Sequence, residues 1–124
     1  MVNTQGELSP ANSQENVSRK AMSASTSQIL KAALVSAAQE GTGQVASPSN
    51  GTAGIKTGTA QTGVFQGEEE LLHFWYSGFV QGKDGVCYCI TVLKESAVSG
   101  QEDAAQVFQE VAQGILALGD EKGN

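Results

Sequence analysis

Hydrophobic and polar residues follow two kinds of spacing along this chain. Apolar residues recur every three to four positions between Ser23 and Gly41, which is the spacing of one helical face. The same spacing returns after Ser99, in a stripe formed by Ala104, Val107, Phe108, Val111, Ile115 and Leu118. Between these segments lie two apolar runs of strand length, Leu71 to Val80 and Val86 to Leu93. The pattern predicts a helix near each end and strands between them.

The two apolar runs should pair as an antiparallel hairpin, because only the sequence Gln-Gly-Lys-Asp-Gly at residues 81–85 separates them. A further strand is expected around Gly54 to Gln61, after a loop of small residues from Gly41 to Ala53. Both alternating sets of side chains in the two runs are apolar, so both faces of the sheet need cover. The predicted fold class is α+β, a three-stranded antiparallel sheet flanked by helices.

The polar beginning of the chain differs from the rest. Residues 1–21 are rich in Asn, Gln, Ser and Glu, so burial cannot offset the entropy lost on ordering them. We expect them to form a polar linker or lead-in, and residues 22–124 to form one folding unit. Ser99 and Glu102 have capping-box spacing and predict the start of the second helix. No apolar run approaches the ~20 residues of a membrane helix and no signal-peptide pattern is present, which predicts a soluble chain.

Charge and rare residues narrow the possible functions. The 13 acidic residues outnumber the 7 basic ones, and no cluster of Lys or Arg occurs, which argues against nucleic acid or an anionic membrane as a partner. Cys87 and Cys89 point to one face of a strand, where neighbours rarely close a disulfide, and we expect both in the core. The single histidine, His73, is expected to be a strand surface residue, and one histidine leaves a zinc site short of ligands.

Lys56-Thr57-Gly58-Thr59 is the string that carries candidate chemistry. A three-residue match is weak alone, so its weight comes from context. A helix ends in Glu40-Gly41-Thr42-Gly43, a loop of small residues follows, and the motif then precedes the aromatic strand from His73 to Val80. This succession resembles the C-terminal part of the transpeptidase domain of class B penicillin-binding proteins, over roughly residues 22 to 118. The resemblance implies the C-terminal portion of a penicillin-binding-protein/β-lactamase-like fold.

Two parts of that family's signature are missing. The full signature joins Ser-x-x-Lys, a Ser-x-Asn motif and Lys-Thr-Gly. No lysine here has serine three positions before it, since those positions hold Val17, Gln28, Ala53, Val80, Thr91 and Gly119. No asparagine has serine two positions before it either. The nucleophile, its lysine base and the middle motif are therefore absent, and we expect this chain alone to be inactive.

The resemblance implies a role for each motif residue. The intact parent would be a serine D,D-transpeptidase of peptidoglycan cross-linking, acting on a stem peptide that ends in D-Ala-D-Ala. Lys56 would supply positive charge and a proton-network contact, and the Thr57 hydroxyl would bind the substrate carboxylate. Gly58 would leave room for a ligand along the strand, and the Thr59 N–H would form half of the oxyanion hole. β-Lactams would bind the same motif residues, which form one wall of the active site. The resemblance implies no metal or organic cofactor. It places the parent at the outer face of the cell membrane.

Other readings stay open at this point. A non-catalytic peptide- or protein-binding module derived from the family would carry the same features, and Lys56, Thr57 and Thr59 could be ordinary strand residues. Members of the family build a five-stranded sheet, whereas this chain offers three strands. An exposed sheet edge can pair with another copy, so a homodimer through that edge is a secondary prediction.

Overall fold

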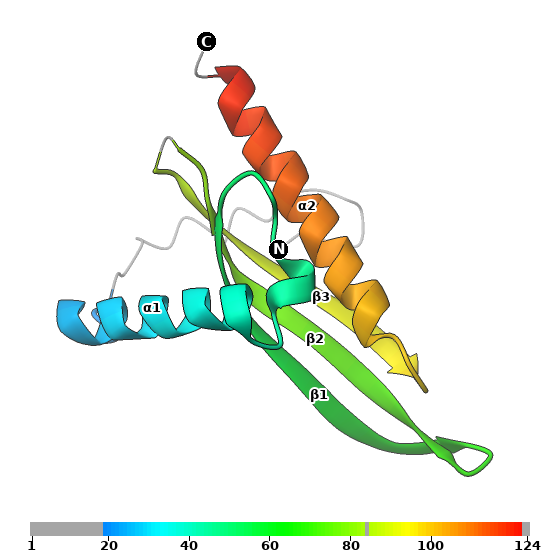
Figure 1. The fold of residues 1–124 in the computed structure, drawn as a ribbon. Helices are drawn as coiled ribbons and strands as arrows, with labels where there is room; N and C mark the ends of the chain where they lie inside the picture. Colours follow the sequence, from blue (N-terminus) through cyan, green and yellow to red (C-terminus); the bar gives the residue numbers. More distant parts are fainter. Residues whose placement is uncertain (1–18, 84, 123–124) are drawn as a thin grey trace, which may run out of the picture.

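The structure is a computed structural model and describes residues 19–83 and 85–122. Its elements are α1 (Ala24–Glu40), the short 3-10 helix η2 (Gln44–Ala46), β1 (Thr52–Gln66), β2 (Glu69–Gln81), β3 (Cys87–Ala97) and α2 (Gln101–Lys122). The strands form one antiparallel sheet in the order β1-β2-β3, with β2 in the centre (Figure 1). The α+β prediction is confirmed. The predicted lead-in falls mostly on residues 1–18, which lie outside the described residues.

Helix α1 begins and ends where the sequence predicts. The Ser23 hydroxyl accepts a hydrogen bond from the Thr26 N–H at 3.1 Å, which caps the first turn. Gly41 ends the helix, and its N–H donates to the Ala37 carbonyl at 3.1 Å. Its end packs most closely against the rest of the protein, since Ala38 is buried whereas Ile29 is 72% exposed. Near the middle of the helix, the Lys31 ammonium donates to the Gln81 side-chain oxygen at 3.0 Å.

Glycine in left-handed backbone conformations shapes both hairpins. β1 and β2 are joined by a two-residue turn in which Gly67 has φ +68°, a value that favours glycine at the first turn position. The β2–β3 turn closes with a hydrogen bond from the Gly85 N–H to the Gly82 carbonyl at 3.1 Å, and Gly85 has φ +79°. The predicted hairpin is confirmed, and both strands are longer than the apolar runs that predicted them.

The core lies between α2 and one face of the sheet. Its strand members include Ile55, Tyr76 and Val80, all at most 1% exposed, and they pack against Phe108 of α2. The buried face of α2 differs from the predicted stripe, since it consists of Ala104, Ala105, Phe108, Ala112 and Leu116. The prediction was wrong for Val107, Val111 and Leu118, which are exposed. Alanines lie toward the sheet because their small side chains let the helix backbone approach closely, while the larger residues remain at the flank.

The start of α2 also differs by one residue from the prediction. The helix begins at Gln101, and the Gly100 carbonyl accepts the first helical hydrogen bond from the Ala104 N–H at 3.0 Å. Gly100 therefore occupies the capping position that was predicted for Ser99. The acidic side chains Glu102 and Asp103 lie in the first turn, where the helix dipole favours negative charge.

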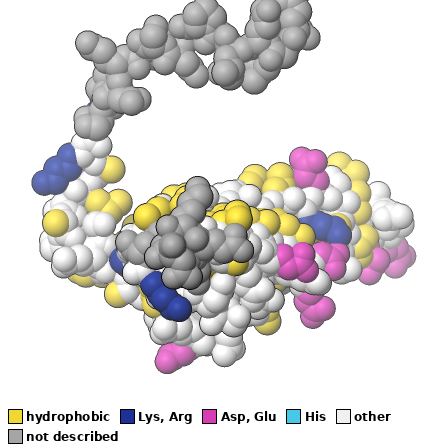
Figure 2. Space-filling view, turned by 90° about the horizontal axis from the view of Figure 1, so that it is seen from above, with side chains coloured by type: hydrophobic (Ala, Val, Ile, Leu, Met, Phe, Trp, Pro, Cys, Tyr) yellow, Lys and Arg dark blue, Asp and Glu magenta, His cyan; other side chains and the backbone are white. Residues whose placement is uncertain are grey.

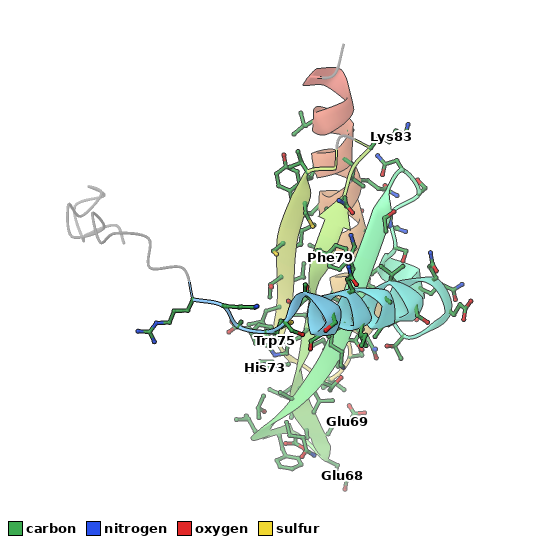
Figure 3. The ribbon with its side chains drawn as sticks, turned by 90° about the vertical axis from the view of Figure 1, so that its left-hand side faces the viewer. Glu68, Glu69, His73, Trp75, Phe79 and Lys83 are labelled. Atoms are coloured by element: carbon green, nitrogen blue, oxygen red, sulfur yellow. The ribbon has the colours of Figure 1, made fainter. Side chains whose placement is uncertain are left out.

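The opposite face of the sheet is covered by α1 only in part. Figure 3 shows α1 crossing the sheet near Phe79 and Trp75 of β2, with α2 on the far side. Farther from α1, Cys87 and Cys89 are exposed, so the prediction that they lie in the core was wrong. Their strand is at the sheet edge, and α1 crosses nearer the other edge, where it contacts β1. Figure 2 shows hydrophobic side chains exposed on the face in view, with basic side chains scattered and not clustered.

Candidate functional site

The motif Lys56-Thr57-Gly58-Thr59 lies in the middle of β1, an edge strand among the described residues. Opposite residues of an antiparallel pair share a face, and Thr57 is opposite the buried Tyr76. Thr57 and Thr59 therefore lie on the α2 face of the sheet. Lys56 and Gly58 lie on the face that α1 crosses. The motif thus places two threonine side chains on one face of the edge strand and the Lys56 side chain on the other face.

The hydrogen-bond pattern of β2 shows which way backbone groups point. The Gly82 N–H donates to the Val86 carbonyl at 3.3 Å, which marks this pair as hydrogen-bonded. Such pairs alternate along an antiparallel ladder, so even-numbered residues of β2 direct their backbone groups toward β3 and odd-numbered residues toward β1. The Leu71 carbonyl agrees with this, because it accepts a hydrogen bond from the Thr62 hydroxyl of β1 at 2.6 Å.

The same alternation orients the motif backbone. Lys56 and Gly58 are opposite odd-numbered residues of β2 and direct their N–H and C=O groups inward, toward that strand. Thr57 and Thr59 direct theirs outward, away from β2. No strand pairs with this side of β1 among residues 19–83 and 85–122. The outer edge at the motif therefore offers backbone donors and acceptors at two alternate residues.

Lys56 and Thr57 each make one side-chain hydrogen bond. The Lys56 ammonium folds back and donates to the Thr57 carbonyl, while its side chain is exposed. The half-buried Thr57 hydroxyl lies 3.1 Å from the hydroxyl of Thr42, which belongs to the turn that follows α1. A positive charge and a paired hydroxyl group therefore flank the outward backbone groups.

Gly58 and Thr59 complete an open surface, and both are exposed. A Cβ atom placed at Gly58 would lie 3.6 Å from the Cβ of Trp75, which is ordinary van der Waals contact. Packing within the chain therefore does not require glycine at this position.

His73 has a structural contact on the neighbouring strand. Its Nδ1 accepts a hydrogen bond from the Ser96 N–H at 3.0 Å, beside the irregularity in the β2–β3 register. Ser96 has φ +46°, so this contact supports an unusual backbone conformation. Within the described ranges, no group of three or more His, Cys, Asp or Glu side chains could hold a metal ion.

The comparison with known protein families identifies the family of the chain. The family described as "Penicillin binding protein transpeptidase domain" matches residues 3–113. The chain belongs to this family. Searches of curated protein sequences and of solved structures gave no match.

Membership of this family associates the chain with the general function of penicillin-binding-protein transpeptidases in the cell wall. The match includes most of the polar stretch before α1, as well as the whole sheet and the first half of α2. Among the described residues of this transpeptidase segment, no helix is long and apolar enough to span a membrane.

Sequence reasoning missed one residue of this site, Thr42. It lies 15 positions before Thr57, and only the fold brings the two hydroxyl groups together. The sequence did hold a signal for Thr42, because a threonine between Gly41 and Gly43 is the only residue of that turn with a side chain. The spacing of apolar residues carried no information about where that side chain points.

Proposed function

We propose that this chain supplies the Lys-Thr-Gly wall of a serine D,D-transpeptidase active site in peptidoglycan cross-linking. In this proposal, the outer edge of β1 binds the terminal carboxylate of a D-Ala-D-Ala stem peptide, or the carboxylate of a β-lactam. The Thr59 N–H supplies half of the oxyanion hole. Family membership supports the reaction class, and the geometry of the edge supports the roles of the individual residues.

The outward backbone of Thr57 and Thr59 is the observation that carries the proposal. An extended peptide can add to a sheet edge by main-chain hydrogen bonds, and alternate residues of the edge then contact it. A donor fixed in a sheet needs no reorganisation when negative charge develops on the scissile carbonyl oxygen. The Thr59 N–H meets that requirement because its strand is held by β2 along the whole motif.

Lys56 and Thr57 serve the charged end of the ligand. A hydrogen bond to an ionised carboxylate is stronger than one between neutral groups, which favours a hydroxyl donor at Thr57. Lys56 adds positive charge to a chain whose formal net charge is -6. An ammonium group has three donors, and the Thr57 carbonyl occupies one of them, which leaves others for the proton network of the complete site.

The chain lacks the Ser-x-x-Lys and Ser-x-Asn motifs, so it binds the acyl donor without reacting with it. In the intact parent, the serine comes from outside this segment and attacks the carbonyl carbon of the penultimate D-Ala. The acyl-enzyme forms as terminal D-Ala leaves. We place that parent at the cell membrane, on its extracytoplasmic face.

A titration monitored by NMR tests the wall directly. The ¹⁵N-labelled chain is titrated with N-acetyl-D-Ala-D-Ala, and the amide signals of Thr57, Gly58 and Thr59 are expected to shift with a Kd on the order of 1 mM, a weak interaction. Thr57→Val keeps the shape of the side chain but removes the donor, and it should weaken binding by roughly ten-fold.

The matched ligand control is the C-terminal amide of the same dipeptide, which lacks the carboxylate. Shifts of equal size with acid and amide would contradict a carboxylate site. Absence of shifts at the motif, with shifts elsewhere on the surface, would favour the alternative of a non-catalytic peptide- or protein-binding module.

A further inference from the structure

The turn Gly41-Thr42-Gly43 lies between the end of α1 and η2, ahead of the motif strand. The Ala37 carbonyl accepts hydrogen bonds from both the Gly41 N–H and the Gly43 N–H, each at 3.1 Å. The chain then enters η2, which packs against α2. Two backbone donors on one carbonyl hold the turn close to the helix end, so the position of Thr42 is fixed by backbone contacts.

The two flanking glycines leave Thr42 as the one side chain of the turn. A Cβ atom at Gly43 would lie 2.9 Å from the Cβ of Ile55, the buried residue that precedes the motif. A Cβ atom at Gly41 would lie 3.0 Å from the Ala37 carbonyl oxygen. Both positions are too tight for ordinary side chains. Thr42 is exposed, and its hydroxyl lies 3.1 Å from that of Thr57.

We propose that Thr42 is a positioning residue that sets the donor direction of the Thr57 hydroxyl. This inference rests on the proposed function, in which Thr57 donates to a carboxylate. Each threonine hydroxyl has one proton and two lone pairs. The Thr42 hydroxyl donates its proton to the Thr57 oxygen, and the Thr57 proton then points to the ligand.

The opposite direction of the hydrogen bond is unsuited to binding an anion. If Thr57 donated to Thr42, a Thr57 lone pair would face the carboxylate, and two acceptors would meet without a proton between them. A ligand carboxylate therefore selects the arrangement in which Thr42 donates. Hydrogen bonds in a chain polarise one another, so the Thr42 proton also strengthens the bond that Thr57 makes.

Thr42→Val and Thr42→Ser separate the hydroxyl from the shape of the side chain. In the NMR titration with N-acetyl-D-Ala-D-Ala, Thr42→Val should raise the Kd by roughly three- to ten-fold, the range of one neutral hydrogen bond. Thr42→Ser should keep the Kd within about two-fold of the native value, because serine retains the hydroxyl donor. Since Thr42 is exposed, both variants should keep the urea midpoint of the native chain.

A double-mutant cycle with Thr57→Val distinguishes positioning from independent binding. If Thr42 acts through Thr57, adding Thr42→Val to Thr57→Val should not weaken binding further. Additive losses would overturn the inference, because Thr42 would then contact the ligand by itself. If the wild-type chain binds and Thr42→Val binds equally well, the inference about Thr42 is also overturned, while the proposed binding function of the motif still stands. Absence of wild-type binding at the motif would instead reject the proposed function on which the inference rests.

Discussion

The α2 face of the sheet and the outer edge of β1 share the same strands but are built in opposite ways. On the α2 face, Tyr76 and Val80 are at most 1% exposed and contact the side chains of a helix. At the edge, Lys56, Gly58 and Thr59 are exposed. The backbone groups of Thr57 and Thr59 point outward there. The first region can therefore hold the fold while the second remains available to a ligand. Substitutions in the two regions should fall into two classes, one affecting stability and one affecting binding.

Phe108→Ala should have the largest effect, because it removes the largest α2 side chain of the core. Truncating a buried phenylalanine costs about 3–5 kcal/mol in the free energy of unfolding, from lost burial and the cavity left behind. Urea denaturation followed by circular dichroism measures this loss. The exposed Val107→Ala on the same helix is the control and should change stability by less than about 0.5 kcal/mol. A small effect of Phe108→Ala would mean that the α2 face does not hold the sheet.

Gly78→Ala and Gly58→Ala compare the same change inside the sheet and at the motif. A Cβ atom at Gly78 would lie 2.1 Å from the Gly54 carbonyl oxygen, so the backbone must shift, at a cost of about 1–3 kcal/mol. At Gly58 the nearest atom is 3.6 Å away, and stability should be nearly unchanged. The added methyl group at Gly58 should weaken N-acetyl-D-Ala-D-Ala binding instead. Equal stability losses at both sites would remove the distinction between the two regions.

Self-association through β3, at the sheet edge opposite β1, is the smallest effect that we expect. We expect weak self-association through β3, since eight consecutive residues from Val86 to Leu93 carry no charge and no proline. Sedimentation equilibrium under reducing conditions should show a dimer at high concentration. Cys89→Lys on this edge should abolish the dimer, and Val107→Lys on the exposed side of α2 should not. A wild-type chain that stays monomeric throughout would contradict the homodimer.

The order and type of the elements could be predicted from local patterns. Ser23 and Gly41 indicated the ends of α1, and the Gly-containing connection indicated the β2–β3 hairpin. These features depend on residues that are near in sequence, where capping and turn chemistry act. The same local patterns correctly predicted that the motif lies on a strand.

Features that depend on distant packing could not be predicted in the same way. Cys87 and Cys89 look like core residues by type, but their exposure follows from lying on an edge strand beyond the cover of α1. The buried face of α2 was predicted from its large residues, whereas alanines such as Ala112 lie against the sheet. The contact between Thr42 and Thr57 joins two hydroxyl groups through the fold alone.

The most direct test of the account is a ¹H–¹⁵N titration of the chain with benzylpenicillin, followed over several hours. The central claim is that β1 provides the binding wall and that the chain lacks the serine nucleophile of a Ser-x-x-Lys motif. We predict fast, reversible shifts at Thr57, Gly58 and Thr59, which disappear when the ligand is removed by dialysis. Absence of shifts at these residues would contradict the wall, and shifts that persist after dialysis would reveal a covalent adduct and a nucleophile within this chain.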